Sequence, residues 1–278
     1  MLEDNKKEIK KIKEVIQDYS DAFNNWNVEK LVKAFHPESM IYWYRPERKY
    51  FYKGMCYAWL EGFSEYQKDD PGIKYHVTPE EIHQRGNTAY ARVRFLIDDP
   101  EEPRDTTDYL TLLKINSRWR IFNKSGHTVD VSKEELLKRI EEKTEFPRND
   151  SKEVKQIQQV LKTYAVAFHE WDIEKIKETF HPEMRINLFD KKLEKLKNTF
   201  RPLPMWKESF EHHINEGITF DIIFGNIDQT GTAAVAIMKW IANTPNGTGD
   251  TLDFLTLLKI EDKWLIVNKS CDIDFEEK

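Results

Sequence analysis

Apolar residues recur at a helical spacing near the beginning of the chain and again near its middle. In the first region they stand three or four positions apart, at Ile9, Ile12, Ile16, Tyr19, Phe23 and Trp26. The second region repeats this stripe at Val154, Ile157, Leu161, Tyr164, Phe168 and Trp171. Such a period is typical of an amphipathic α-helix with one buried face. We therefore predict a long helix in each half of the chain.

A short second helix is predicted after each long one. Asn27 and Asp172 are suitable N-cap residues, because their side chains accept hydrogen bonds from the first free backbone N–H groups. The short helices run to Phe35 and Phe180, each of which is followed by a His-Pro pair. They end there because the residue before a proline avoids the helical region.

Extended segments and one further helix follow in each half. In the first half we predict a helix at residues 57–67 and strands at 40–45, 49–54, 73–84, 88–97, 105–115 and 118–124. Asn116 and Ser117 form a two-residue turn between the last two strands, and Glu261 and Asp262 take that place in the second half. The predicted fold class is α+β, with N-terminal helices packed on a mostly antiparallel sheet.

The chain repeats itself at a fixed offset of 145 residues. "FHPE" occurs at 35–38 and 180–183, and "DYLTLLKINSRWRIFNKS" at 108–125 returns as "DFLTLLKIEDKWLIVNKS" at 253–270. The histidines of the first element, His36 and His181, are expected to stabilise a turn with a hydrogen bond. Because units of this length have the size of whole domains, the sequence indicates a tandem pair.

Domain boundaries follow from the repeat. We predict domains at residues 1–128 and 150–278, joined by a linker at 129–149. Within the linker, Ser132 and Glu135 have the spacing of a capping box, so the linker is predicted to be helical.

The composition excludes several classes of protein. Charged residues make up 33% of the chain, the mean hydropathy is −0.72, and no apolar run approaches the roughly 18 residues of a membrane span. The first residues lack the apolar stretch of a secretory signal, so we predict a cytoplasmic protein with no membrane partner. A net charge of −6 without a basic stripe argues against a nucleic-acid partner.

Residues that hold metals or cofactors show no familiar spacing. Cys56 and Cys271 occupy unrelated positions in the two halves, so we predict two free thiols. His212 and His213 are adjacent on a predicted helix and are expected to point in different directions, which argues against a shared metal ion. The sequence also lacks a glycine-rich phosphate loop and a serine nucleophile elbow. We predict no cofactor and no metal.

The segment "YSDAFNNWNVEKLVKAFHPE" at 19–38, together with the terminal hairpin, carries a family resemblance. The chain resembles the nuclear transport factor 2-like superfamily, which includes ketosteroid isomerases and SnoaL-like polyketide cyclases. Its hairpin is most similar to the group named "Putative lumazine-binding". The resemblance covers nearly all of both halves and implies two cone-shaped domains. It leaves the function open, because this fold carries enzymes, binding modules and scaffolds.

The terminal hairpin predicts a polar cluster on one face of the sheet. With a two-residue turn at 116–117, Leu110 pairs with Asn123 and Asp108 pairs with Ser125. Paired residues share a face, so the cluster contains Asp108, Leu110, Leu112, Ile121, Asn123 and Ser125. The second half offers the same set as Asp253, Leu255, Leu257, Ile266, Asn268 and Ser270.

The resemblance to ketosteroid isomerases assigns possible roles within this cluster. Their oxyanion hole combines a helix tyrosine with a protonated aspartic acid, and these positions fall on Tyr19 with Asp108 and on Tyr164 with Asp253. Their catalytic aspartate falls on Trp43 in the first half and on a leucine in the second, so isomerisation by that mechanism is not expected. A structural tyrosine–aspartate pair, a ligand site and a catalytic site remain open.

Aromatic residues distinguish the two halves. The run "YWYRPERKYFY" at 42–52 is suited to the mouth of a pocket for a flat ligand, whereas the matching stretch at 187–200 has lost most of its aromatic residues. We therefore predict that the first domain holds the larger or more aromatic pocket, and that the second is mainly structural. The predicted ligand-binding residues of the two domains are Tyr19, Trp43, Asp108, Asn123, Tyr164, Asp253 and Asn268.

The predicted function is the binding of a small hydrophobic or aromatic molecule in an apolar pocket between helices and sheet. One alternative is an enzyme of the cyclase, isomerase or dehydratase type with an unidentified base. Another is a non-catalytic interaction scaffold whose pockets are filled by its own side chains. The opposite sheet face, with Tyr109, Leu113 and Phe122, is too apolar for solvent, so we predict that the domains pack as an intramolecular pseudo-dimer.

Overall fold

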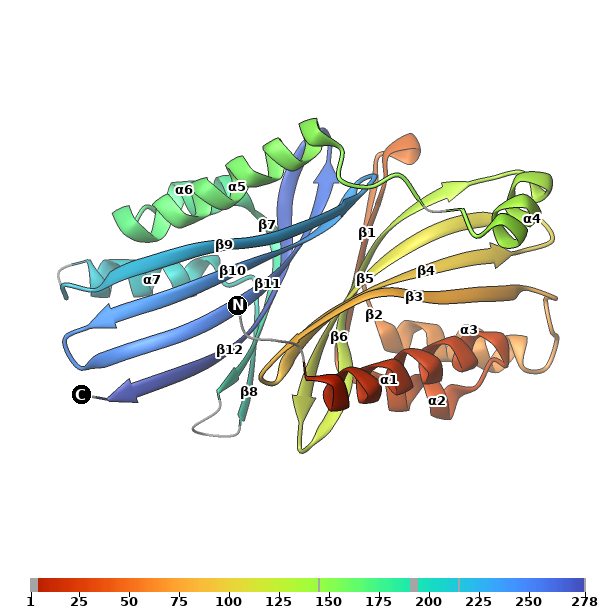
Figure 1. Ribbon diagram of the computed structural model, residues 1–278, viewed down its shortest axis with the longest axis horizontal. Helices are drawn as coiled ribbons and strands as arrows, with labels where there is room; N and C mark the ends of the chain where they lie inside the picture. The colour runs from red at the N-terminus through yellow and green to blue at the C-terminus, as the bar shows by residue number, and fades with distance from the viewer. Residues whose placement is uncertain (1–4, 145, 191–194, 215, 278) are drawn as a thin grey trace. The chain divides into compact units, whose positions relative to one another are not determined.

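The computed structural model describes residues 5–144, 146–190, 195–214 and 216–277. The chain divides into two compact units, residues 1–85 with 89–147, and residues 86–88 with 148–278. Each unit contains helices and a six-stranded sheet, as the predicted α+β tandem requires (Figure 1). Among the helices in the described residues, none combines the length and the apolar character needed to cross a membrane.

The first unit begins with helices and continues into its sheet. Its elements are α1 (Lys6–Asn24), α2 (Val28–Ala34), β1 (Phe35–Arg45), β2 (Tyr50–Met55), α3 (Trp59–Tyr66), β3 (Lys74–Arg85), β4 (Thr88–Asp98), β5 (Arg104–Ile115), β6 (Arg118–Asp130) and α4 (Lys133–Glu142). The strands lie in the order β2-β1-β6-β5-β4-β3. The β1–β6 pair is parallel, while β5 is antiparallel to β6.

The second unit repeats this order of elements. It contains α5 (Ser151–Glu170), α6 (Ile173–Thr179), β7 (Phe180–Asp190), β8 (Lys195–Phe200), α7 (Leu203–His213), β9 (Thr219–Thr230), β10 (Ala233–Thr244), β11 (Gly247–Ile260) and β12 (Lys263–Glu277). Its strands lie in the order β8-β7-β12-β11-β10-β9, which matches the first sheet strand for strand.

Local hydrogen bonds confirm the predicted helix starts. The side chain of Asn27 accepts from the backbone N–H of Lys30 over 2.9 Å, and Asp172 caps the corresponding helix α6. Ser132 caps α4 by accepting from the N–H of Glu135 over 3.1 Å. These bonds satisfy backbone donors that have no partner within the helix.

The repeated FHPE elements open the first strand of each sheet. The predicted hydrogen bond of the histidines is present, since Nδ1 of His36 accepts from the N–H of Glu38 over 3.2 Å. In the second unit, Nδ1 of His181 accepts from Glu183 over 3.1 Å. The short helices end one residue earlier than predicted, because Phe35 already has an extended backbone and belongs to β1.

The hairpin turns also follow the sequence. Asn116 and Ser117 have φ values of 49° and 64°, and Glu261 and Asp262 have values of 47° and 67°. Two successive positive φ values define the turn type whose twist suits a two-residue hairpin. The strand predicted to end at residue 124 continues to Asp130, because the whole of β5 pairs with it.

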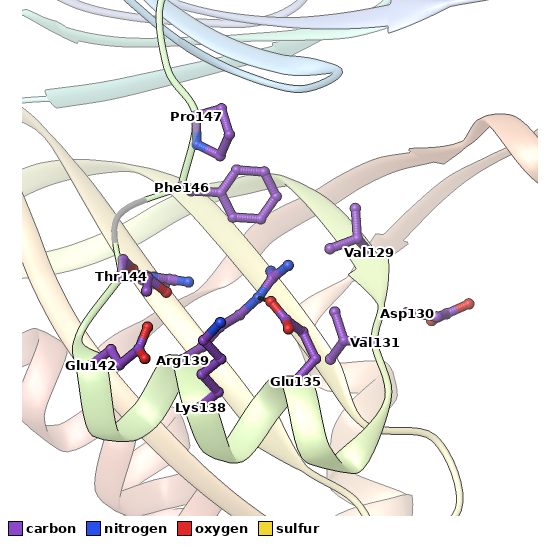
Figure 2. A pocket seen from close by; sticks show the side chains of 11 residues that line it. Val129, Asp130, Val131, Glu135, Lys138, Arg139, Glu142, Thr144, Phe146 and Pro147 are labelled. Atoms are coloured by element: carbon purple, nitrogen blue, oxygen red, sulfur yellow. Dashed lines mark hydrogen bonds and ion pairs between the residues drawn. The ribbon is translucent and has the colours of Figure 1, made fainter.

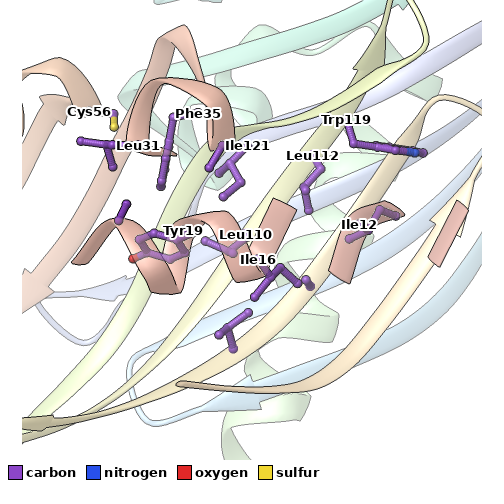
Figure 3. Close-up of a cluster of buried hydrophobic side chains, with 14 of the residues drawn as sticks. Ile12, Ile16, Tyr19, Leu31, Phe35, Cys56, Leu110, Leu112, Trp119 and Ile121 are labelled. Carbon is purple, nitrogen blue, oxygen red and sulfur yellow. The ribbon is translucent and has the colours of Figure 1, made fainter. Parts of the chain in front are cut away.

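The core of the first unit lies between α1 and the sheet. Ile12, Ile16 and Tyr19 of α1 are buried against Leu110 and Ile121 of the sheet face that they share (Figure 3). On the opposite face, the side chains predicted to need cover are fully buried, among them Tyr109, Phe122, Phe254 and Val267. The predicted pseudo-dimer arrangement stays a prediction.

Candidate functional site

A β-bulge in the terminal hairpin changes which residues share a face. Leu112 pairs with Ile121, but Thr111 already pairs with Asn123, so Phe122 is left without an opposite residue. The predicted register was therefore wrong beyond Ile121. A one-residue shift moves every later side chain to the other face.

The bulge removes both asparagines from the predicted cluster. Asn123 now shares a face with Thr111, and Asn268 shares a face with Thr256 in the second unit, which has the same register shift. Nδ2 of Asn123 donates to Oγ of Ser125 over 3.3 Å, on the face opposite Asp108. The prediction that Asn123 and Asn268 stand beside the aspartates is corrected accordingly.

Lys124 takes the place that the sequence predicts for Asn123. It pairs with Leu110, on the face that carries Asp108. Nζ of Lys124 lies 2.6 Å from Oδ1 of Asp108, and the hydroxyl of Tyr19 donates to Oδ2 over 3.1 Å. The predicted tyrosine–aspartate contact is thus present, with a lysine as a third member. The repeated "NKS" at the end of both hairpins contains this lysine, and is the sequence feature that could have indicated it.

The second unit holds the same three residue types. The hydroxyl of Tyr164 donates to Oδ2 of Asp253 over 3.4 Å, and Lys269 forms an ion pair with the same carboxylate. We call Tyr19–Asp108–Lys124 and Tyr164–Asp253–Lys269 the two triads. In each triad the tyrosine comes from the long helix, the aspartate from the fifth strand and the lysine from the sixth.

Burial and charge act against each other in the triads. The side chain of Asp108 is 1% exposed and that of Lys124 is 15% exposed. Burial raises the pKa of Asp108, while the charge of Lys124 and hydrogen bonds from Lys124 and Tyr19 oppose that rise. Burial also raises the pKa of Tyr19 well above its ordinary value, and the neighbouring Asp108 adds to this. Tyr19 is therefore a neutral hydrogen-bond donor at physiological pH.

The lysine of the second triad is held in its charged form. Burial lowers the pKa of Lys269, but the attraction to the neighbouring acidic groups, Asp253 foremost, and the hydrogen bond to Asp253 together outweigh it, so the pKa lies above the ordinary value. Lys269 therefore offers an ammonium group rather than a neutral amine.

Aromatic rings surround each tyrosine. The ring of Tyr19 lies 5.0 Å from that of Phe35 and 4.9 Å from that of Phe95. In the second unit, Trp240 replaces Phe95 and its ring lies 4.9 Å from that of Tyr164. Within the part of the chain that the structure describes, Nε1 of Trp240 is buried and has no hydrogen-bond partner.

Trp43 lies on the triad face of the first sheet. It pairs with Gly126, which itself pairs with Asp108, and its half-buried ring stacks on that of Tyr52 at 5.1 Å and 27°. The corresponding residue of the second unit is Leu188, which pairs with Cys271. The aromatic difference between the two faces that the sequence predicts is therefore present around these strands.

A cavity of about 520 Å³ lies outside the triads, beside α4 (Figure 2). Its lining residues are Arg94, Val129, Asp130, Val131, Glu135, Lys138, Arg139, Glu142, Thr144, Phe146 and Pro147. Two of its cations are already engaged. Arg94 contacts both carboxylate oxygens of Asp105 at 3.0 and 2.6 Å, and Arg139 contacts the same carboxylate at 2.6 Å. This cavity is a second possible ligand site, which the sequence did not indicate.

The remaining histidine and cysteine predictions have different outcomes. Cys56 and Cys271 are buried free thiols, as predicted. The expectation that His212 and His213 diverge was wrong. Their ring nitrogens and a carboxylate oxygen of Glu216 all lie within 4.8 Å of one another, because one ring uses Nε2 and the other Nδ1.

Comparison with known proteins gives one curated relative and many solved structures. The aldolase FrzH of Cladobotryum sp. is 27% identical over 110 residues, which are 40% of this chain and 82% of that protein. A protein of unknown function with a nuclear transport factor 2-like fold from Shewanella baltica OS155 is 22% identical and covers 44% of this chain and 94% of its own, with a TM-score of 0.35. A protein of unknown function with a cystatin-like fold from Nostoc punctiforme PCC 73102 is 14% identical and covers 46% of this chain and 96% of its own, with a TM-score of 0.37.

The family comparison covers most of the sequence. The sequence model of the family described as "Putative lumazine-binding" matches residues 7–127 and again residues 152–272. Each match runs from the long helix of one unit, α1 or α5, into the sixth strand of its sheet, β6 or β12, and so covers one copy of the repeat. The chain therefore belongs to this family, and it contains two tandem copies of its domain.

Proposed function

We propose that the chain binds a small molecule, and that the triads form the polar ends of apolar sites between the helices and the sheets. The supporting observation is the ion pair of Lys124 and Asp108 in an interior that is otherwise apolar and aromatic. A buried ion pair is often no more stabilising than apolar residues of similar volume. The same pair nevertheless occurs in both units, although their surrounding residues differ.

The chemistry of the triads limits the ligand. Tyr19 and Lys124 both carry donor groups, and Lys269 is held as an ammonium. A ligand that offers an acceptor, such as a carbonyl oxygen, complements these donors. The walls are aromatic and apolar, so the rest of the ligand is a small hydrophobic or aromatic body. The name of the family supports a ligand of this kind without identifying it.

The test is a thermal-shift screen of the full chain against a metabolite library, with each hit confirmed by calorimetry. A ligand at 100 times its Kd stabilises the folded state by about 2.7 kcal/mol. We expect Tyr19→Phe with Tyr164→Phe to reduce this stabilisation, because both triads then lose a donor. Arg139→Ala is the control for the cavity beside α4. Loss of binding in Arg139→Ala alone would move the ligand site to that cavity.

A second candidate function is aldol-type chemistry, which the similarity to a protein named aldolase favours. A lysine that forms a Schiff base must act as a neutral amine. The raised pKa of Lys269 argues against that role, and supports hydrogen-bond donation to a developing enolate oxygen instead. Borohydride treatment of the protein with a ketone donor is therefore expected to leave the mass of the chain unchanged. A reduced adduct on Lys124 or Lys269 would contradict this form of the mechanism.

The location of the protein in the cytoplasm remains part of this proposal. We also propose that the two units pack as a pseudo-dimer. The apolar character of the sheet faces opposite the triads supports this packing.

A further inference from the structure

The end of α7 brings two imidazoles and one carboxylate together on the surface of the second unit. The helix ends at His213, and the backbone N–H of Glu216 then donates to the carbonyl oxygen of His213 over 3.0 Å. This turn directs the side chain of Glu216 back toward both rings. Its Oε2 lies 2.5 Å from Nδ1 of His213, and its Oε1 lies 3.4 Å from Nε2 of His212.

We propose that His212, His213 and Glu216 bind one divalent transition-metal ion of the zinc class. The three ligand atoms lie within 4.8 Å of one another. Zinc–nitrogen bonds of about 2.0–2.1 Å place neighbouring ligands of a tetrahedral ion roughly 3.3 Å apart. Nε2 of His212 lies 3.4 Å from Oε1 of Glu216, which is close to that value. Nδ1 of His213 lies at a hydrogen-bond distance of 2.5 Å from Oε2, so the Glu216 side chain has to rotate and widen this separation to admit the ion.

The ligand types select the class of metal. Imidazole suits zinc, copper and nickel, whereas magnesium and calcium prefer oxygen ligands. Two histidines and one glutamate are a known zinc ligand set that leaves a fourth position for water. His212 and Glu216 are exposed, so the ion reaches the site directly from solvent.

The first unit supplies a comparison within the same chain. Phe63 and Phe210 correspond, because each packs edge-on against the tryptophan that follows the long helix, at 5.4 Å in both units. Three residues further along, Tyr66 in the first unit takes the place of His213. The first unit therefore has no imidazole at this position, and the proposed site belongs to the second unit.

Trp171 provides a local reporter. Its ring lies 6.2 Å from that of His213, so an ion held by His213 lies close to this indole. Bound Cu²⁺ or Co²⁺ is expected to quench the fluorescence of Trp171. The variant Trp171→Phe should remove most of that change while the ion still binds.

The experiment uses the full chain without a histidine tag, in equilibrium dialysis against ZnCl₂, with MgCl₂ as the hard-ion comparison. We expect saturation at one zinc ion per chain and no saturable magnesium binding. His212→Ala, His213→Ala and Glu216→Gln should each weaken zinc binding by about tenfold or more, the loss seen when even the supporting groups of a metal site are removed. His76→Ala, which removes an exposed histidine of the first unit, should leave binding unchanged.

Thermal melts without metal establish that each variant is folded. Zinc binding that persists in the triple variant, or that never saturates at one ion per chain, would overturn the proposal. Equal loss of binding in His76→Ala would also overturn it, because the ions would then be held by scattered surface histidines. These outcomes are independent of the small-molecule proposal, since the triads are unchanged in all of these variants.

Discussion

Trp119 donates a hydrogen bond from its indole Nε1 to Oε2 of Glu8 over 2.6 Å, which joins the first turn of α1 to β6. The second unit repeats the contact, with Trp264 and Glu153 at 2.7 Å. Glu8 is 8% exposed and also contacts the ammonium groups of Lys11 and Lys114. The contact thus joins the long helix, which carries Tyr19, to the terminal hairpin, which carries Asp108.

The first prediction concerns the pH dependence of this contact. Burial raises the pKa of Glu8, but hydrogen bonds from Lys11, Trp119 and Lys114 outweigh it and lower the pKa from 4.5 to about 2. A lowered folded-state pKa stabilises the fold above the ordinary pKa, and this contribution is lost as the pH falls toward 2. Glu8→Gln should therefore destabilise the protein at pH 7 by about 1–3 kcal/mol. It should also reduce the loss of unfolding free energy that accompanies a fall in pH.

Urea unfolding at a series of pH values measures both effects. Glu14→Gln, on the exposed face of the same helix, is the matched control and should follow the wild-type curve. An acid limb in Glu8→Gln as steep as that of the wild type would show that other carboxylates cause the pH dependence.

Local features of the fold could be predicted from the sequence, and non-local ones could not. The caps at Asn27 and Ser132 and the turn at Asn116 depend on neighbouring residues only, so their residue types were sufficient. The position of Lys124 beside Asp108 was not predicted, because it depends on the bulge at Phe122. That bulge arises from the pairing of β6 with β5, and counting residues along a single strand cannot reveal it. The turn that brings Glu216 to His213 was missed for the same kind of reason.

The second prediction tests the energetic balance of the first triad. Lys124→Met leaves the carboxylate of Asp108 buried without its cation, which should destabilise the protein by about 3–5 kcal/mol. The triple change Tyr19→Phe, Asp108→Leu and Lys124→Met removes every member of the network, so most of that stability should return. The urea midpoint measures the difference.

Lys33→Met is the control for the loss of an ion pair, because Lys33 is 72% exposed and pairs with Asp18 on the surface. It should change the stability by no more than about 1 kcal/mol. A triple variant as unstable as Lys124→Met would mean that the triad contributes net stability, which would weaken the case for a ligand site.

The third prediction concerns Gly126, which pairs with Asp108. An added Cβ would lie 2.7 Å from the carbonyl oxygen of Thr107 and 2.8 Å from Oδ1 of Asp108. The backbone oxygen cannot move aside without disturbing β5, so Gly126→Ala should destabilise the protein by about 1–3 kcal/mol. Gly62→Ala in α3, where a Cβ meets nothing within 4 Å, should instead stabilise it by about 0.5–1 kcal/mol. Equal melting temperatures for the two variants would contradict this reading of the contacts.

The fourth prediction concerns the two thiols. Burial raises the pKa of Cys56 and that of Cys271 to about 12 in each case. Since the thiolate is the reactive form, neither cysteine should react with a disulfide reagent at pH 8 within minutes in the folded protein. Both should react at once in guanidinium chloride. Fast reaction of one thiol in the native protein would show that its surroundings open readily.

The fifth prediction identifies the unit that binds the ligand more tightly. Trp240 replaces Phe95 beside the second triad, and among the described residues its Nε1 has no hydrogen-bond partner. A buried donor without a partner costs about 1–3 kcal/mol, and a ligand acceptor at this point would remove that penalty. Once a ligand is identified, Trp240→Phe should weaken its binding by about tenfold, which corresponds to 1.4 kcal/mol.

The sequence instead predicts tighter binding in the first unit, because the aromatic residues around Trp43 lie there. Trp43→Leu gives the first unit the residue found in the second, so it is the matched test of that expectation. The orphaned indole of Trp240 is the stronger argument, since an aromatic wall adds contact area without leaving an unmet hydrogen bond. Calorimetry on both variants decides between them: loss of affinity in Trp43→Leu with no change in Trp240→Phe would place the tighter site in the first unit.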